Sequence, residues 1–339
     1  MNRCIELASK NIGYTYPNPL VGSVIVYNNK IIGEGSHAKY GESHAEVNAI
    51  NSVKDKRLLQ ESTLYVNLEP CNHYGNTPPC TEAIINNNIK KVVIGSQDPN
   101  KLVNGSGIEK LRLSGCDVNL GVLNKQCVEL NKRFFTYHKY KRPYIILKWA
   151  ESKDGFISPI KSNKTLKKVN WISGESAKKL SHIWRSEEHS ILVGVQTVID
   201  DNPNLTTRLV GGRNPIRIVL DPNNRTPKNS KIFSRDSETI VLTKQNKRKT
   251  LSNNQNINFE SVFSILKSLH DLKIQSVIVE GGTRTLNHFL ENNIWDSVRV
   301  FKSAKKLGMG IKGPKIDFRE LNQSKIGEDF LYEIERLNF

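Results

Sequence analysis

The segment that decides the fold spans residues 63–87 and reads TLYVNLEPCNHYGNTPPCTEAIINN. It opens with Thr63–Leu68, whose apolar, β-branched and aromatic residues predict a strand. A polar, proline-rich loop follows, and Thr81–Asn87 then predicts a helix. The segment therefore predicts a strand that leads through a loop into a helix, with Cys71 just after the strand and Cys80 just before the helix.

The same alternation of strands and helices extends over residues 1–136. Arg3–Asn11 has the apolar spacing of a helix. Val21–Tyr27 and Lys30–Gly33 flank Asn28-Asn29, which predicts a β-hairpin because asparagine tolerates positive φ. The remaining predicted elements are helices over His44–Val53, Gly107–Ser114 and Asn124–Phe135 and strands over Lys91–Gly95 and Val118–Leu120. This order favours a partly parallel sheet with crossover helices.

A second α/β series begins after the basic segment Tyr137–Pro143, where we place a domain boundary. The predicted domains are residues 1–142 and 143–339, which fits a prior of about 100–200 residues per domain. Predicted strands of the second domain are Tyr144–Ala150, Ser190–Val195, Ile216–Leu220, Thr239–Leu242 and Ser276–Glu280, predicted helices are Glu175–Ser186 and Ser261–His270, and Asp221–Ser237 and Thr243–Ile257 are predicted loops.

Composition excludes several classes of protein. Of the 339 residues 37% are hydrophobic and 24% charged, which excludes a disordered or collagen-like chain. The longest apolar runs, Val21–Tyr27 and Pro143–Ala150, fall short of the roughly 20 residues of a membrane span. The N-terminal residues lack the apolar core of a secretion signal, so we expect a cytoplasmic protein with no membrane partner.

The net charge of +17 raises the alternative of a nucleic-acid-binding protein or a tRNA base deaminase. However, the Lys and Arg residues run through the whole chain and do not form one stripe. We therefore expect no nucleic-acid partner and a small anionic substrate. We also expect a homo-oligomer. The five cysteines, an odd number without an export signal, make a disulfide framework improbable.

Three potential metal ligands lie at the ends of predicted elements: His44, Cys71 and Cys80. One imidazole and two thiolates, with a fourth position left for water, form the ligand set of a catalytic zinc. Because helix N-termini carry partial positive charge, we expect both thiols to have lowered pKa values. Glu46, two residues beyond His44, is placed to reach a zinc-bound water and to act as the catalytic proton shuttle.

His-x-Glu followed by Pro-Cys and a second cysteine at a helix start is typical of zinc-dependent deaminases of amino-pyrimidines and purines. Each of these residues alone is more often an ordinary core or surface residue. A structural zinc site without turnover remains an alternative, although no fourth Cys or His lies at a fitting spacing.

The spacing of the cysteines and several further motifs resemble the deaminase domain of the bifunctional riboflavin-biosynthesis deaminase/reductase family. Eight residues separate Cys71 from Cys80, where nucleoside and tRNA deaminases usually have two. The other motifs are Asn18-Pro19-x-Val21-Gly22, Gly35-x-His37, Gly41-x-x-His44-Ala45-Glu46 and Gln97-Asp98-Pro99-Asn100. The resemblance implies a cytidine-deaminase-like three-layer α/β/α domain. It would convert 2,5-diamino-6-(5-phosphoribosylamino)pyrimidin-4(3H)-one to 5-amino-6-(5-phosphoribosylamino)uracil.

The resemblance also implies that the substrate pocket is lined by Asn18, His37, His73, Asp98 and Asn100. Such amide, imidazole and carboxylate groups suit a pyrimidinone with several donors and acceptors. Asn76 stands where the family usually has Lys or Arg. A charged contact is therefore missing there or is supplied from elsewhere.

Two glycine-rich segments, one in each domain, are candidates for phosphate binding. Val277–Thr283 combines a strand, a glycine pair and a helix start, a weak phosphate-site motif. In the first domain Gly105-Ser106-Gly107 is weaker still, because Lys110 stands where the dinucleotide fingerprint needs its third glycine.

The second half contains, in this order, Lys148–Gly155, Trp171–Ser173, Arg185-x-x-x-His189, Asp201-Asn202-Pro203-x-Leu205-Thr206-x-Arg208 and Glu280-Gly281-Gly282. These motifs resemble the reductase domain of the same family, which is similar to dihydrofolate reductase in fold. The resemblance implies NADPH-dependent reduction of the ribosyl group to ribityl. Its implied substrate contacts are Lys148, Arg185, Leu205, Arg208 and Glu280, and its implied cofactor contacts are Trp171, Thr197, Asp201, Gly281, Gly282 and Thr283. A deaminase with a degenerate reductase half remains the alternative within this family.

Overall fold

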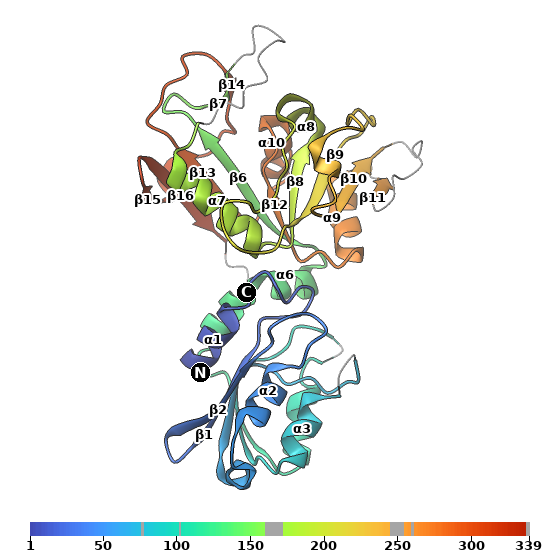
Figure 1. Ribbon diagram of the computed structural model, residues 1–339, viewed down its shortest axis with the longest axis vertical. Coiled ribbons are helices and arrows are strands. Elements are labelled where there is room, and N and C mark those ends of the chain that lie inside the picture. The colour runs from blue at the N-terminus through green and yellow to red at the C-terminus, as the bar shows by residue number, and fades with distance from the viewer. Residues whose placement is uncertain (76–77, 102, 160–171, 245–253, 259–260, 337–339) are drawn as a thin grey trace. The chain divides into compact units, whose positions relative to one another are not determined.

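The computed structural model describes the chain except for residues 76–77, 102, 160–171, 245–253, 259–260 and 337–339, and of residues 254–258 it describes only the backbone (Figure 1). The chain divides into two compact units, Met1–Lys141 and Arg142–Phe339. Among the described residues no helix combines the length and the apolarity that a membrane crossing needs.

Unit 1 is a five-stranded sheet in the order β2-β1-β3-β4-β5. Its strands are β1 (Gly22–Tyr27), β2 (Lys30–Ser36), β3 (Thr63–Leu68), β4 (Lys91–Ser96) and β5 (Asp117–Leu120). The first hairpin and the β1–β3 pair are antiparallel, whereas β3, β4 and β5 run parallel. Asn28 and Asn29 form the hairpin turn with φ of 47° and 60°, as predicted from their tolerance of the left-handed region.

Helices cover both faces of this sheet. They are α1 (Asn2–Ser9), α2 (Ala45–Ser52), α3 (Cys80–Asn86), α4 (Ser106–Leu113), α5 (Asn124–Leu130) and α6 (Lys132–Tyr140), with a 3-10 helix over Lys56–Glu61. Helices α1 and α5 contact one another and the sheet, and α2, α3 and α4 form a second contacting group. Fully buried side chains such as Ile25, Leu64 and Ile94 fill the core. The result is the predicted three-layer arrangement.

The helix predicted over Asn124–Phe135 is wrong in one respect, because it breaks at Asn131 into α5 and α6. The buried amide of Asn131 accepts a hydrogen bond from Leu20 N (2.8 Å) and donates one to Leu20 O (2.9 Å). A second buried amide, that of Asn67, also donates to Leu20 O (2.9 Å). The basic segment Tyr137–Pro143 at the predicted domain boundary is also partly helical. Helix α6 runs to Tyr140, and the next residue, Lys141, has φ of 55°.

Unit 2 is built on a nine-stranded sheet in the order β11-β10-β9-β8-β12-β6-β13-β16-β15, beside a two-stranded ribbon of β7 and β14. The nine strands are β6 (Tyr144–Glu151), β8 (Ser190–Gly194), β9 (Ile216–Leu220), β10 (Thr239–Thr243), β11 (Asn254–Asn258), β12 (Ser276–Val279), β13 (Ser297–Lys302), β15 (Asn322–Ile326) and β16 (Asp329–Glu335), and the ribbon pairs β7 (Phe156–Ser158) with β14 (Ile311–Lys312). All pairs from β11 to β13 are parallel, and β16 and β15 continue the sheet antiparallel.

Both faces of this sheet are buried. Along β6 the side chains of Ile145 and Leu147 belong to one hydrophobic cluster, and those of Tyr144 and Ile146 belong to another. The helices that accompany the sheet are α7 (Glu175–Glu187), α8 (Val195–Asp201), α9 (Val262–Asp271) and α10 (Thr283–Glu291), with 3-10 turns over Lys231–Phe233 and Phe318–Glu320. Continuous apolar strands are the expected pattern for a mostly parallel sheet.

Three details of unit 2 differ from prediction. The strand predicted over Ser190–Val195 ends at Gly194, and the next residues form the short helix α8, which sequence patterning missed. The predicted loop Thr243–Ile257 contains most of β11, a polar strand at the sheet edge, while residues 245–253 lie outside the described part of the chain. An edge strand pairs on one side only, so it needs no apolar pattern.

Replacement of Asn131 by Ala should lower the free energy of unfolding of unit 1 by about 1–3 kcal/mol, because the buried Leu20 N–H loses its acceptor while Leu20 O keeps the Asn67 amide. All four tryptophans belong to unit 2. Urea unfolding followed by far-UV circular dichroism should therefore begin at lower urea, while the tryptophan fluorescence transition stays in place. The exposed control Asn119→Ala should change neither curve, and equal shifts of both curves by Asn131→Ala would contradict the assignment.

Candidate metal centre and cation cluster

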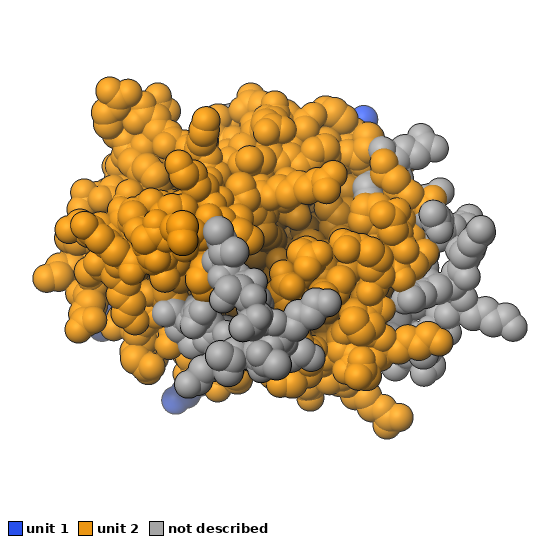
Figure 2. Space-filling model, turned by 90° about the horizontal axis from the view of Figure 1, so that it is seen from above, with its two compact units in different colours: residues 1–141 blue, residues 142–339 orange. Residues whose placement is uncertain are grey.

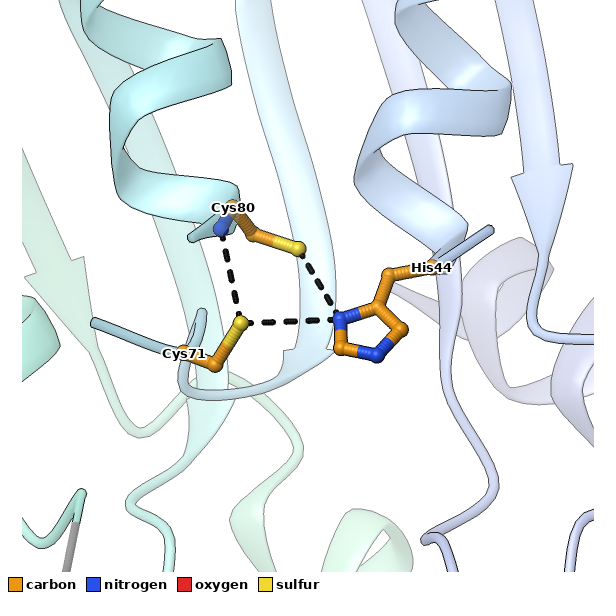
Figure 3. A group of neighbouring side chains, drawn as sticks. All are labelled: His44, Cys71 and Cys80. Atoms are coloured by element: carbon orange, nitrogen blue, oxygen red, sulfur yellow. Dashed lines mark hydrogen bonds between the residues drawn. The ribbon is translucent and has the colours of Figure 1, made fainter. Parts of the chain in front are cut away.

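His44, Cys71 and Cys80 converge in unit 1 from three different elements (Figure 3). His44 is the residue before α2, Cys71 follows β3, and Cys80 is the first residue of α3. The His44 Nδ1 atom lies 3.2 Å from Cys80 Sγ and 3.5 Å from Cys71 Sγ. All three ligand atoms lie within 4.8 Å of one another. The structure thus brings together the three predicted metal ligands.

One imidazole nitrogen and two sulfurs are a donor set that suits Zn²⁺. A hydrogen bond from the Cys80 thiol, with help from His44, lowers the pKa of Cys71 to about 4. The backbone N–H of Cys80, at the start of α3, also donates to Cys71 Sγ (3.4 Å). The pKa of the buried Cys80 thiol is instead raised by its hydrogen bond to Cys71. The expected lowering of the pKa is therefore seen for Cys71, which accepts the hydrogen bonds, while Cys80 is the donor of the pair.

Glu46 lies in the first turn of α2 and is almost fully buried, with 3% of its surface exposed. Burial raises the pKa of its carboxyl to about 7, and the neighbouring Cys71 adds to this rise. A carboxyl group with a pKa near neutrality can both accept and release a proton at physiological pH. Glu46 thus lies in the helical turn that follows the metal ligand His44, with a carboxyl whose pKa is about 7.

Two of the predicted pocket residues, Asn18 and His37, meet beside this centre. Asn18 Nδ2 lies 3.0 Å from His37 Nε2, and His37 Nδ1 lies 3.2 Å from the carbonyl oxygen of Ser43. Because a carbonyl only accepts, Nδ1 carries the proton and Nε2 accepts from the Asn18 amide. Burial lowers the pKa of His37, which keeps it neutral. Its ring centroid lies 5.3 Å from that of His44.

Asp98 and Asn100 lie just beyond β4. The buried Asp98 carboxylate accepts a hydrogen bond from Asn100 N (2.7 Å), and burial raises the pKa of Asp98 to about 7. His73 is exposed on the loop between the two cysteines. Asn76, on the same loop, lies outside the described residues.

In unit 2 the predicted substrate contacts Lys148, Arg185 and Glu280 form one half-buried ion cluster. Arg185 Nε and Nη2 donate to the two carboxylate oxygens of Glu280 at 3.2 and 2.7 Å. Lys148 Nζ lies 3.8 Å from Glu280 Oε1. Burial opposes ionisation of Glu280, but the charges of Arg185 and Lys148 outweigh it and lower the pKa to about 2. The carboxylate is therefore charged and holds the two cations in place.

Arg208 has a different environment from Arg185. It is exposed, and among the described residues no carboxylate forms an ion pair with its guanidinium. Its backbone N–H donates to His182 Nδ1 (3.1 Å), and Leu205, three residues earlier, is buried with φ of 54°. Arg208 is thus fixed through its backbone while its charge is available to a ligand.

His182 is a residue of this cluster that sequence reasoning missed. It precedes Arg185 by three residues on α7, so the two lie on the same helix face. Burial and the charges of Arg185 and Arg208 lower the pKa of His182 to about 4. The neutral ring therefore accepts the Arg208 N–H with Nδ1. The only sequence signal was its helical spacing from Arg185.

The predicted cofactor contacts gather at the ends of β8 and β12. Thr197 and Asp201 lie on α8, and Gly281, Gly282 and Thr283 connect β12 to α10. A Cβ added at Gly282 would lie 3.9 Å from Thr197 Oγ1, which places α8 beside this loop. Trp171 lies outside the described residues.

These elements follow the carboxyl ends of parallel strands, the usual place for ligands in such sheets. Figure 2 shows unit 2 from the top of Figure 1, the side on which α8 lies. The surface of unit 2 is hollowed near the centre of this face.

Comparisons with known proteins agree for both units. A family model described as the cytidine and deoxycytidylate deaminase zinc-binding region matches residues 1–96. The model of the RibD C-terminal domain matches residues 143–331. The riboflavin biosynthesis protein RibD of Aquifex aeolicus is 40% identical, and the alignment covers 99% of this chain and 97% of that protein.

Two solved structures resemble the whole chain. The first is a diaminohydroxyphosphoribosylaminopyrimidine deaminase/5-amino-6-(5-phosphoribosylamino)uracil reductase from Thermotoga maritima, with 38% identity and a TM-score of 0.88, covering 99% of this chain and 97% of that one. The second is RibD of Acinetobacter baumannii, with 29% identity and a TM-score of 0.87, covering 99% and 98%.

Replacement of Cys71 by Ser should reduce bound zinc from about one ion per chain to well under half, because a hydroxyl is a far poorer zinc ligand than a thiolate. Metal analysis of purified, dialysed protein measures this. The control variant Cys116→Ser, which changes a buried thiol outside the metal centre of unit 1, should keep its zinc. Full zinc occupancy in Cys71→Ser would contradict the assigned ligand set.

Proposed function

Because this chain belongs to the RibD family of riboflavin-biosynthesis proteins, we propose how its two units divide the family's two activities. The protein is a bifunctional enzyme of riboflavin biosynthesis, with a zinc-dependent deaminase and an NADPH-dependent reductase. We propose that residues 1–142 carry the deaminase and residues 143–339 the reductase. The proposed substrate is 2,5-diamino-6-(5-phosphoribosylamino)pyrimidin-4(3H)-one, which loses its 2-amino group before its ribosyl group is reduced.

In the deaminase, His44, Cys71 and Cys80 would hold the zinc ion, which when bound activates water for hydrolysis. Glu46 takes a proton from the attacking water and delivers it to the departing amino group. The second proton of the water passes to a ring nitrogen, so that the amino-substituted ring carbon becomes a carbonyl and the amino group leaves as ammonia. The burial of Glu46 supports this role, because a pKa of about 7 lets the carboxyl act in both directions.

The pocket residues of the deaminase orient the pyrimidinone. Asn18 uses one amide hydrogen on His37, so its remaining hydrogen and its oxygen are available to the ring. The carboxyl of Asp98, whose pKa is also about 7, can accept or donate a hydrogen bond. We assign Asn100 and His73 to the same pocket on the basis of the family resemblance.

In the reductase, NADPH supplies a hydride when bound, and the protein's task is to bind and orient. The ion cluster of Lys148, Arg185 and Glu280 carries a net charge of +1. Together with Arg208 the site has three cationic side chains and one carboxylate, which gives a net charge of +2. A phosphate monoester carries about −1.5 to −2 at pH 7, so the charges match. We propose that Arg208 binds the phosphate, while Glu280, Lys148 and Arg185 bind the sugar near Leu205.

The cofactor would lie against α8 and the loop before α10. Thr197 and Asp201 come from α8, and Gly281, Gly282 and Thr283 offer backbone N–H groups close to that helix. Trp171 is included on the resemblance alone. The remaining proposals are a cytoplasmic location, no nucleic-acid partner and a homo-oligomeric state, which light scattering can measure.

One observation carries this assignment: the metal-ligand group and the ion cluster lie in separate units of one chain, and each suits one of the two reactions. The two sites can therefore be inactivated independently.

Replacement of Glu46 by Gln should reduce ammonia release at least about 100-fold, since general acid–base catalysis contributes roughly 10²–10⁴-fold. Zinc content should not change. NADPH oxidation should stay normal when the deaminated uracil is supplied directly. Glu61→Gln, which alters an exposed acid of unit 1, is the control. Ammonia release at the wild-type rate in Glu46→Gln would exclude the proton-shuttle role.

Replacement of Arg208 by Ala should lower kcat/KM for reduction roughly 10–150-fold, because hydrogen bonds to charged groups contribute about 1.5–3 kcal/mol. Steady-state NADPH oxidation with the deaminated uracil measures this, and ammonia release should be unaffected. Arg319→Ala, which removes an exposed arginine of unit 2, is the control. An unchanged kcat/KM would remove Arg208 from the site.

A further inference from the structure

Glu69 is a buried carboxylate between β3 and the metal ligand Cys71, with 4% of its surface exposed. It accepts four backbone hydrogen bonds. Oε1 accepts from Gly107 N (2.9 Å) and Ile108 N (3.2 Å). Oε2 accepts from Asp98 N (3.1 Å) and Gly105 N (3.0 Å). These N–H groups surround the carboxylate from the segment that follows β4 and from the first turn of α4.

The glycines of this segment are needed for its approach to Glu69. Gly105 has φ of +92°, a conformation that side-chain-bearing residues rarely adopt. A Cβ at Gly107 would lie 2.1 Å from Pro70 O and 3.2 Å from Glu69 Oε1. The Gly105-Ser106-Gly107 segment, which weakly resembles a phosphate-binding loop in sequence, therefore wraps an internal carboxylate.

This arrangement links the metal centre to the segment after β4 that contains Asp98 and Asn100, which we call the substrate loop. Glu69 precedes Cys71 by two residues, and its own N–H donates to Ser96 O (2.9 Å), which continues the pairing of β3 with β4. At the same time the Glu69 carboxylate accepts the backbone N–H of Asp98. The side chain of Asp98 in turn accepts the backbone N–H of Asn100 (2.7 Å). One carboxylate thus fixes the pocket residues relative to the metal ligand.

We propose that Glu69 is a positioning residue of the deaminase site, which sets the orientation in which Asp98 and Asn100 bind the pyrimidine ring. This inference rests on the proposed function of unit 1. Its chemical basis is that only an ionised carboxylate offers acceptors on both oxygens to four converging donors. Glutamine has nearly the same volume but would turn an NH₂ group toward two of those N–H groups.

The test compares Glu69→Gln with the wild type in ammonia release from the diaminopyrimidinone substrate. We expect KM to rise at least about 10-fold while kcat stays within about threefold, because a misplaced Asp98 weakens binding of the ground state and the transition state alike. Zinc content should stay at about one ion per chain. NADPH oxidation with the supplied uracil should also be unchanged, since that reaction belongs to unit 2.

Two further variants sharpen the comparison. Gly105→Ala keeps the carboxylate but strains the loop, so it should also raise KM, by a smaller factor than Glu69→Gln does. It also serves as the test if Glu69→Gln yields no folded protein. Asp55→Asn removes a carboxylate of unit 1 that accepts a backbone N–H away from the site, and should leave KM unchanged.

The inference is overturned if KM in Glu69→Gln stays within twofold of the wild type. It is also overturned if zinc content falls in step with activity, because Glu69 would then support the metal ligand and not the substrate loop. A wild-type protein that releases no ammonia would instead refute the proposed function, and with it this inference.

Discussion

The parallel pairing of β3 with β4 is the constraint on which the deaminase site depends. It aligns Leu68 with Ser96, so both strands end at the same edge of the sheet. Cys71 follows one end and Asp98 the other, which places a candidate metal ligand and a proposed pocket residue at the same edge although they are far apart in sequence. In unit 2 the strands β8, β12 and β6 are also parallel neighbours. Helix α8 follows β8, Glu280 follows β12 and Lys148 lies near the end of β6, so all three lie at one edge of that sheet.

Each unit places a glutamate directly after one of these strands, buried in the case of Glu69 and half-buried in the case of Glu280, yet the two are neutralised differently. Backbone N–H groups surround Glu69, whereas the side chains of Arg185 and Lys148 surround Glu280. A buried charge must be compensated in one of these ways. Fixed backbone dipoles suit a structural role, whereas cationic side chains held by a single carboxylate keep a net positive charge that suits an anionic ligand.

The sequence predicted the features whose cause is local. The metal ligands, the Asn28-Asn29 turn and the order of strands and helices depend on residues that are close together or on a specific motif. The features that it missed depend on distant partners. Asn131 breaks a helix because its amide binds Leu20, and Glu69 meets Gly105 and Gly107 only in the folded chain. His182 is informative only once Arg208 lies against it.

The account's central claim is that one chain performs two consecutive reactions in separate units. The most direct measurement is anaerobic incubation of the zinc-loaded protein with the diaminopyrimidinone ribosyl phosphate and NADPH, with ammonia and NADPH followed in the same vessel. The account predicts both signals, with ammonia release leading NADPH oxidation and equal final amounts. Ammonia release without NADPH oxidation, or NADPH oxidation that precedes ammonia, would contradict it.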